Sequence, residues 1–353
     1  MFSFLDNYII EEYKFNDKNF SLISKNGKEI SLKILGKDVD LENKKKEYPL
    51  LDNFIKIIKI KDSKEMISYI KDLDCRFFSI SLPKSDGFFI TEKYERDDSI
   101  FAMYISKNIY DSSINMNAFI SSYKKYCVEI LKKKQILIEV NNYMKTNEVI
   151  MNKNNFEVSL YNFKKTRKEF TKIPYIDSHI NKIYLDKKRN KLRYSKCEDE
   201  VNLSKLIKMT INFFKEDDEK DICGLVNNNN SDYLKEENIQ NYLMDFITGN
   251  RNKRIDYNVF VYLEENTHDI LGFSFGYIDD EYKLGGISTL FVEEKNRNKG
   301  ISRKLQEAHE IFFRDNGIMN EEINTLGGNQ KAKEIYTKAF GFHINRILYC
   351  YNA

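Results

Sequence analysis

The chain has 353 residues, of which 41% are hydrophobic, 14% aromatic and 31% charged, with only three prolines. This length predicts two domains of about 150 residues each, and this composition excludes a disordered or collagen-like chain. No apolar run approaches the roughly 20 residues that a membrane helix needs, and the start MFSFLDNYIIEEYK lacks the basic region of a signal peptide. We therefore expect a cytoplasmic protein with no membrane partner.

Charge is divided unevenly between the halves. Residues 1–189 carry 35 Lys and Arg against 27 Asp and Glu, a net charge of +8, whereas residues 190–353 carry 22 against 27, a net charge of −5. A basic half can indicate nucleic-acid binding, but these lysines are spread along the predicted helices and turns, as on any solvated surface. We therefore do not expect a nucleic-acid partner.

Cysteine and histidine usage argues against a metal or disulfide framework. The five cysteines are odd in number and never form a CxxC pair, which fits reduced cytosolic thiols. The four histidines show no metal-ligand spacing, so we predict no metal site. These residues are Cys75, Cys127, Cys197, Cys223 and Cys350, and His179, His268, His309 and His343.

The first half begins with a predicted β-hairpin at 18–35, where apolar and polar residues alternate on both sides of Asn26-Gly27. Basic residues, Pro174 and a lack of periodicity then predict a linker at 166–190. Between them, the patterns predict strands at 54–60, 76–82, 87–94, 99–106, 136–140 and 156–163, and helices at 63–73, 117–135 and 145–153.

The second half repeats this order of elements. Its predicted strands are 191–197, 256–263, 270–278, 287–293, 323–326 and 342–351, and its predicted helices are 201–215, 232–248, 302–315 and 329–339. A shift of 186 residues places SIFAMYIS (99–106) on GGISTLFV (285–292) without a gap. The same shift places Glu148, Val149, Asn155 and Phe156 on Glu334, Ile335, Gly341 and Phe342. We therefore predict an internal duplication.

One motif of the second half has the features of a ligand-binding turn. Arg297-Asn298-Lys299-Gly300-Ile301-Ser302 follows a predicted strand and opens a predicted helix. A helix start offers unpaired N–H groups and a positive dipole end, which suit a phosphate, and Gly300 lets the backbone approach an anion closely. Taken alone, the hexapeptide is more typical of an ordinary basic turn between a strand and a helix.

The wider context resembles the acetyl-CoA-binding signature of the GCN5-related N-acetyltransferase (GNAT) superfamily. That signature has a strand ending in Val, five residues to an Arg, and then x-x-G-x-G/A, here Val292, Arg297 and Gly300, with Ser302 in place of the last glycine. Downstream, Asn329, Ala332, Tyr336 and Gly341-Phe342 keep the family spacing. The resemblance covers about 191–353.

The resemblance implies an α/β (α+β) fold with two tandem GNAT-like domains, each a mixed, mostly antiparallel central sheet flanked by helices. We expect an N-terminal hairpin with a degenerate copy at 1–165, the linker at 166–190, and a catalytic domain at 191–353. The first copy has no phosphate turn, since Asp111, Ile114, Met116 and Ile150 stand at the places of Arg297, Gly300, Ser302 and Tyr336. The two copies are expected to pack as an internal pseudo-dimer within a monomer.

In function, the resemblance implies an N-acetyltransferase that passes an acetyl group from acetyl-CoA, without a metal, to a primary amine of a small molecule or peptide by direct attack. The strand would bind the pantetheine arm, the turn the pyrophosphate, and Tyr336 would protonate the departing CoA thiolate. The residues implied in cofactor binding are Leu290, Phe291, Val292, Arg297, Asn298, Lys299, Gly300, Ile301, Ser302, Arg303 and Asn329. For Tyr336, the alternative is an ordinary core tyrosine.

The general base is open. The family often places a carboxylate where this chain has Gly286 and Asn324, and neither side chain takes a proton. A water relay, a residue of the 216–233 loop, or no base at all are the alternatives, and Asp279, Asp280 and Glu281 are further candidates that also fit a solvated turn. Five acids among residues 216–221 either attract a cationic amine or solubilise a loop.

Two other functions stay open at this point. One is a non-catalytic acyl-CoA-binding or interaction protein that keeps the cofactor turn without a base. The other is an aminoacyl-transferring relative of the peptidoglycan-bridge enzymes, which also pair two such domains but generally lack the R-x-x-G-x-G turn, so the turn argues against it.

Overall fold

The computed structural model describes residues 10–16, 21–24, 29–31, 76–80, 87–93, 99–105, 109, 112–141, 145–166, 176–221, 231–249, 255–280 and 282–353. The chain divides into two compact units. Unit 1 comprises Met1–Val158 together with Ile347–Ala353, and unit 2 comprises Ser159–Arg346. Each unit is thus completed by a segment from the other half of the sequence.

Unit 2 contains a mixed sheet in the order β10-β9-β11-β12-β13-β14-β8. Its neighbouring strands are antiparallel except for β13 and β14, which run parallel. The strands are β8 (Glu157–Thr166), β9 (Ile180–Asp186), β10 (Lys191–Tyr194), β11 (Ile255–Leu263), β12 (Ile270–Asp279), β13 (Leu284–Val292) and β14 (Asn320–Leu326). The helices are α7 (Leu203–Asp218), η2 (Ser231–Leu234), α8 (Glu236–Thr248), η3 (Glu294–Asn296), α9 (Ile301–Asp315), α10 (Gln330–Glu334) and η4 (Ile335–Ala339).

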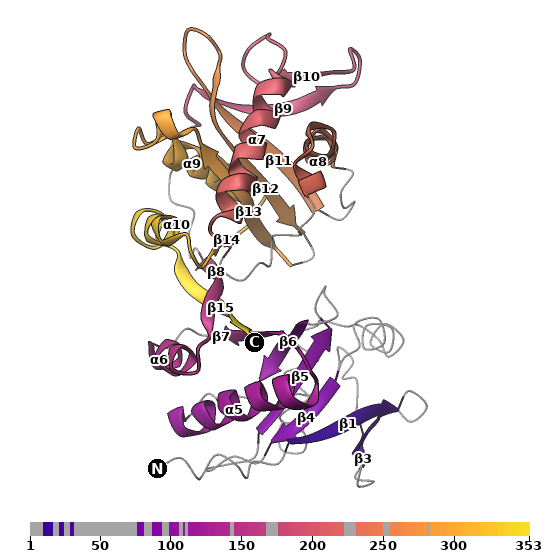
Figure 1. The fold of residues 1–353 in the computed structure, drawn as a ribbon. Helices are drawn as coiled ribbons and strands as arrows, with labels where there is room; N and C mark the ends of the chain where they lie inside the picture. The colour runs from indigo at the N-terminus through magenta and orange to yellow at the C-terminus, as the bar shows by residue number, and fades with distance from the viewer. Residues whose placement is uncertain are drawn as a thin grey trace. The chain divides into compact units, whose positions relative to one another are not determined.

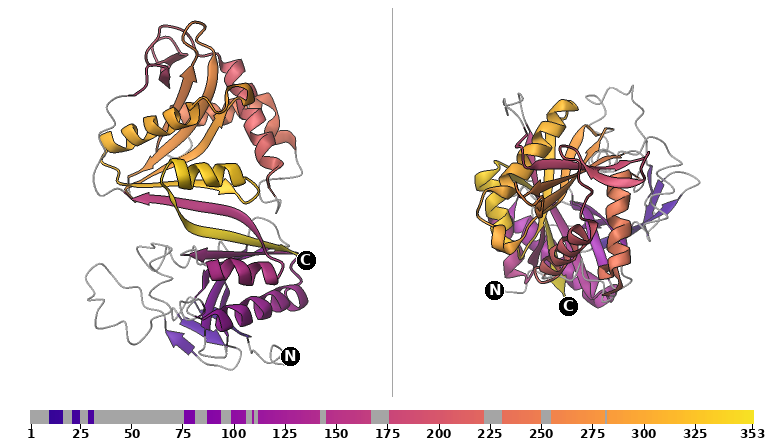
Figure 2. Two further views of the ribbon diagram at one scale, coloured as in Figure 1. Left: turned by 90° about the vertical axis from the view of Figure 1, so that its left-hand side faces the viewer. Right: turned by 90° about the horizontal axis from the view of Figure 1, so that it is seen from above.

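Helices cover both faces of this sheet (Figures 1 and 2). Along β11, Val259 and Val261 pack into a cluster with residues of α7 and α8, whereas Phe260 between them packs into a second cluster with α9. Side chains on a strand alternate between its two faces, so a strand buried on both faces is apolar throughout. This explains why β11 and β12 read as continuous apolar runs in the sequence.

Unit 1 contains a sheet in the order β15-β7-β6-β5-β4-β1-β2-β3. The strands are β1 (Ile10–Asn16), β2 (Ser21–Ser24), β3 (Glu29–Ser31), β4 (Arg76–Ile80), β5 (Gly87–Lys93), β6 (Ser99–Ile105), β7 (Gln135–Asn141) and β15 (His343–Asn352). The pairing of β2 with β3 confirms the predicted hairpin. The helices are α5 (Ser113–Lys125), continued by a π-helical turn η1 (Tyr126–Ile130), and α6 (Lys145–Lys153).

The two units repeat one arrangement of strands. In unit 1, β6 and β7 are the parallel pair, with Ser99 opposite Gln135; in unit 2, Gly285 lies opposite Glu321. Both pairs of positions are related by the 186-residue shift, so the two parallel pairs share one register. Because register is set independently of the order of elements, this agreement supports the predicted duplication.

The fold class is confirmed, since mixed, mostly antiparallel sheets flanked by helices are what the structure shows. Some element bounds were wrong. The segment expected as a linker contains β9. This strand pairs with β10 and β11, although its sequence shows no clear periodicity. The helix expected at 117–135 begins at Ser113 instead, because the hydroxyl of Ser112 caps it. The strand at 54–60 and the helix at 63–73 lie outside the described residues.

The described part of the chain contains no helix with both the length and the apolar character needed to cross a membrane.

Candidate active site

Strands β13 and β14 part from each other inside unit 2. Their parallel pairing runs from Leu284 opposite Asn320 to Ile287 opposite Ile323, although β13 continues to Val292. The antiparallel register of β13 with β12 slips at the same place, because Ser288 is an extra residue between two regular pairs. Such a β-bulge bends and twists its strand. The bulge therefore accounts for the separation, and the backbone of 288–292 faces open space instead of a neighbouring strand.

The opening between these strands is a cavity of about 500 Å³. All the site residues predicted from the sequence line it, except Lys299. The lining residues are Leu160, Phe213, Glu216, Asp217, Lys220, 287–292, 296–298, 300–303, 323–326, Asn329, Lys331, Ala332, Ile335, Tyr336, Ala339 and Phe340. Segments from α7, β13, α9, β14 and η4 thus meet at one place.

The turn between β13 and α9 leaves the start of the helix open. Asn298 and Gly300 have left-handed backbones, with φ of 64° and 79°. A Cβ at Gly300 would meet no atom within 4 Å, so glycine is favoured there by its backbone and not by a lack of space. No side chain caps this N-terminus. The first-turn N–H groups of residues 301–303 therefore remain for an anion, at the positive end of a 15-residue helix.

Basic side chains of the turn contact neighbouring parts of the protein. The guanidinium of Arg297 donates to the carbonyl oxygen of Val292 at 2.9 Å and to the carboxylate of Glu216 at 2.5 Å. Lys299 donates to Asn296 at 2.9 Å. Arg297 therefore ties the turn to the end of β13 and to the last part of α7, and the backbone is the part of the turn that is oriented for a ligand.

Tyr336 lies in η4, with 8% of its surface exposed. Its ring meets Phe163 edge-on, with centroids 5.5 Å apart, and stacks on Phe340. The hydroxyl makes no hydrogen bond within the described part of the chain, and the residue lines the cavity. Burial, and secondarily the nearby Asp217, raise the pKa of Tyr336 well above its usual value. The phenol is therefore protonated at neutral pH.

Asn329 has a local structural role. Its side-chain oxygen accepts a hydrogen bond from the backbone N–H of Ala332 at 3.2 Å and so caps α10. The helix predicted at 329–339 is not one regular α-helix, because a π-helical turn begins at Ile335. The cap and the π-turn together set where Tyr336 projects.

The acidic segment at 216–221 was expected to be a loop, but α7 continues through Asp218. Glu216 and Asp217 consequently lie in the last turn of α7 and line the cavity. Burial is the main cause that raises the pKa of Asp217 to about 6; Lys220 opposes this increase, and Asp218 and other nearby acids add to it. Sequence reasoning did not single out Asp217, because nothing in a run of acids shows which carboxyl is buried.

Outside the end of α7, none of the described positions considered for the general base places a carboxylate in the cavity. A Cβ at Gly286 would lie 2.1 Å from the ring of Tyr277, so no carboxylate fits there. Asn324 accepts a hydrogen bond from Asn162 at 2.8 Å. Asp280 pairs with Lys283 in the β12–β13 turn. Neither Asp279 nor Asp280 lines the cavity, and Glu281 lies outside the described residues.

Comparison with known proteins identifies the class of the second half. Residues 225–342 match the acetyltransferase (GNAT) family, and this part of the chain is therefore a GNAT domain. No curated protein matches the chain.

Several solved structures align with most of the chain at low sequence identity. A GCN5-related N-acetyltransferase from Sphaerobacter thermophilus is 11% identical, with a TM-score of 0.48, over 86% of this chain and 90% of that one. A tandem GNAT protein from the clavulanic acid biosynthesis pathway is 6% identical, with a TM-score of 0.43, over 79% and 82%. A GNAT-family acetyltransferase from Colwellia psychrerythraea is 12% identical, with a TM-score of 0.44, over 79% and 85%.

Proposed function

We propose that this protein is an N-acetyltransferase that transfers an acetyl group from acetyl-CoA to a primary amine of a small molecule or peptide. The observation that carries the proposal is the meeting of a parted β13 with an open helix N-terminus in one cavity of a GNAT domain. Acetyl-CoA has an extended amide-containing arm and a pyrophosphate. The parted strand offers backbone hydrogen-bonding groups to the arm, and the helix N-terminus offers N–H groups to the pyrophosphate.

Different residues of the cavity would bind different parts of the cosubstrate. Around Leu290 and Phe291, and at the N–H of Val292, the backbone of β13 has no strand partner on the β14 side and can hydrogen-bond the amides of the pantetheine arm as a missing strand would. The carbonyl of Val292 is already bonded to Arg297. The N–H groups of residues 301–303 suit the pyrophosphate. Ser302 is small enough for a phosphate to approach the helix start. Arg297 acts indirectly, by holding the turn to β13 and α7.

The reaction needs a base and an acid. The amine nitrogen attacks the thioester carbonyl carbon, a backbone N–H of β13 stabilises the resulting oxyanion, and the C–S bond then breaks. Tyr336 gives its proton to the leaving thiolate. Asp217 takes the proton that the ammonium group must lose before attack, because a carboxyl with a pKa of about 6 is ionised at pH 7 and still basic. The nitrogen loses a second proton as the amide forms, and this proton goes to solvent. The first proton returns from Asp217 to the tyrosinate, so the products are the amide, CoA as a thiol and one released proton.

The acidic end of α7 also supports a cationic acceptor. Glu216 is paired with Arg297, whereas Asp217 is not part of an ion pair among the described residues. A positively charged amine would stabilise the ionised form of Asp217 by offsetting the cost of burial. A peptide N-terminus or a small diamine meets this requirement equally.

The proposal is tested on the full chain by two measurements. Calorimetry should show one acetyl-CoA bound per chain, with desulfo-CoA as a competitor that carries the same arm and pyrophosphate. CoA release should then be followed over a panel of amines and peptides. Binding without any acyl transfer would favour the non-catalytic acyl-CoA-binding function, and no binding would contradict both.

A further inference from the structure

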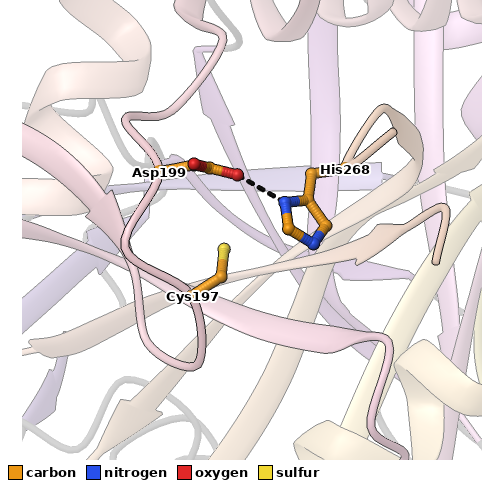
Figure 3. A group of neighbouring side chains, drawn as sticks. All are labelled: Cys197, Asp199 and His268. Atoms are coloured by element: carbon orange, nitrogen blue, oxygen red, sulfur yellow. Dashed lines mark hydrogen bonds and ion pairs between the residues drawn. The ribbon is translucent and has the colours of Figure 1, made fainter. Parts of the chain in front are cut away.

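A thiol, a carboxylate and an imidazole meet in unit 2 away from the cavity. The ligand atoms of Cys197, Asp199 and His268 all lie within 4.8 Å of one another, and an oxygen of Asp199 bonds Nδ1 of His268 (Figure 3). None of the three residues lines the cavity. The sequence predicted no metal site because Cys197 and His268 are far apart along the chain and only the fold brings them together.

We propose that Cys197, Asp199 and His268 bind a zinc-type transition-metal ion. Thiolate, imidazole and carboxylate are the three protein ligand types that zinc takes, commonly with water in a fourth position. The sulfur and nitrogen donors favour such an ion over Mg²⁺ or Ca²⁺, which prefer oxygen alone. From zinc bond lengths of about 2.0–2.3 Å, ligand atoms around one tetrahedral ion lie roughly 3.3–3.6 Å apart. Small side-chain rotations would bring the observed group to that spacing.

The two segments that carry these ligands are each held in place by the backbone. In the first segment, which joins β10 to α7, the N–H of Ser195 bonds the carbonyl of Lys182 at 2.9 Å, and the N–H of Val201 bonds the carbonyl of Leu192 at 3.1 Å. Cys197 also packs against the apolar cluster of α7 and α8. The first segment is therefore fixed on both sides of Cys197 and Asp199.

The second segment is the turn between β11 and β12. The N–H of His268 bonds the carbonyl of Glu264 at 3.0 Å, and the N–H of Glu264 bonds the carbonyl of Asp269 at 2.9 Å. Ligands on segments that are already ordered cost less conformational entropy when a metal binds. The ion would join the β10–α7 segment to the β11–β12 turn, replacing the Asp199–His268 hydrogen bond and releasing the thiol proton of Cys197 to solvent.

A metal titration of the reduced, chelator-treated full chain tests this proposal. Co²⁺ should bind with one ion per chain and give the near-ultraviolet charge-transfer band of a cobalt thiolate, and Zn²⁺ should displace it. Cys197→Ser should remove the band, and His268→Gln should weaken Zn²⁺ binding at least about tenfold, as even indirect metal partners contribute 10–100-fold. Asp199→Asn changes an exposed residue without altering its size, so it should weaken binding without disturbing the fold.

His179→Gln is the matched control. His179 and Asp177 form a similar pair, with Nδ1 2.8 Å from the carboxylate oxygen, but they belong to no three-ligand group among the described residues. This variant should keep both the band and the affinity. A band that survives in Cys197→Ser, or Zn²⁺ affinity equal in wild type and Asp199→Asn, would overturn the proposal. The measurement is independent of acetyl-CoA, so its outcome does not bear on the proposed transferase activity.

Discussion

Helices α5 and α9 follow corresponding strands of the two units, β6 and β13, yet only the N-terminus of α9 is open. In unit 1 the hydroxyl of Ser112 accepts a hydrogen bond from the N–H of Asn115 at 3.4 Å, so α5 caps itself. In unit 2 the residue before the helix is Gly300, which has no side chain to do so. A helix N-terminus whose N–H groups are bonded to a side chain of the same protein has fewer N–H groups free to bind an anion. The two units thus keep a similar arrangement of strands, while the capped start of α5 leaves fewer N–H groups for a ligand than the start of α9 does.

Other paired positions keep the fold and differ in chemistry. Ile150 and Tyr336 are related by the 186-residue shift, and each has 8% of its surface exposed. The position is thus a buried helical one in both units, and only unit 2 carries a hydroxyl there. Met116, at the place of Ser302, is fully buried. Burial is therefore shared at the first pair of positions but not at the second, where Ser302 is partly exposed. At both pairs, the hydroxyl group occurs in unit 2 alone.

The largest expected effect is on cosubstrate binding. Gly300→Asp should abolish acetyl-CoA binding in calorimetry, because a carboxylate at the helix start would repel the pyrophosphate. Gly300→Ala is the control, since alanine adds neither a charge nor a capping group and a Cβ there would meet no atom within 4 Å, and it should retain measurable binding. Ile114→Asp makes the matching change in unit 1 at an exposed residue and should have no effect. Loss of binding in Ile114→Asp alone would reverse the assignment of the two units.

The next largest effect concerns the proposed acid. Tyr336→Phe should lower kcat by about 10²–10⁴-fold, the usual contribution of a general acid, while acetyl-CoA binding changes little. Steady-state kinetics and calorimetry on the same preparation separate these effects. Tyr277→Phe serves as the control, because that hydroxyl donates to Glu322 at 2.8 Å outside the cavity. An unchanged kcat in Tyr336→Phe would mean that water protonates the thiolate.

Asp217→Asn should change the pH dependence as well as the rate. The wild-type rate should fall as pH drops through about 6, because the base becomes protonated. The asparagine variant should lose this limb and be slower by about 10²-fold at neutral pH. A retained limb at the same pH would assign the titration to another group.

Asp217→Asn should also change the stability of the fold, and the sign of this change follows from the pKa of Asp217. The folded-state pKa of Asp217 is raised from 3.8 to about 6, so the folded chain binds the proton more tightly than the unfolded chain does. The free energy of unfolding should therefore decrease as pH rises between about 4 and 6. Asp217→Asn should lack this contribution and melt at a higher temperature at pH 7, as measured by calorimetric scans. A lower melting temperature would show that the carboxylate stabilises the fold.

The smallest effect tests a backbone feature shared by the two units. Asn155 and Gly341 are related by the 186-residue shift, and both have left-handed backbones, with φ of 63° and 70°. Gly341→Ala should cost about 1 kcal/mol in the free energy of unfolding, whereas Gly341→Asn should cost less. Denaturant unfolding measures both changes. Equal costs for the two variants would mean that these positions are not equivalent.

Much of unit 2 was predictable because its signals are local. The Val292–Ser302 spacing located the strand, turn and helix start, and all but one of the residues predicted for the site line the cavity. The bulge at Ser288 was not predictable, because an extra residue is defined only relative to the paired strand. The burial of Asp217 was missed for a similar reason, since it depends on what packs around the end of α7.

The boundaries of the two units could not be predicted from motifs either. The 186-residue shift places β8 and β15 at matching positions, and each would be expected to complete its own copy. Instead, Ser159–Thr166 belong to the unit formed by the second half, where β8 pairs with β14. Which copy a strand completes depends on competition between partner strands with similar sequence patterns. The strand's own sequence therefore does not show which partner it will pair with.

The membership of 347–353 in unit 1 has a consequence for how the chain is made. Tyr349 and Cys350 are buried there, and the N–H of Ala353 bonds the carbonyl of Lys134 at 2.7 Å. During synthesis, the N-terminal part of a chain emerges first and usually folds first. Here unit 1 is not complete until residues 347–353 have been translated, whereas unit 2 is continuous in the sequence and has all its residues once Arg346 has been added. A premature stop after Arg346 would therefore damage the half of the protein that was made first.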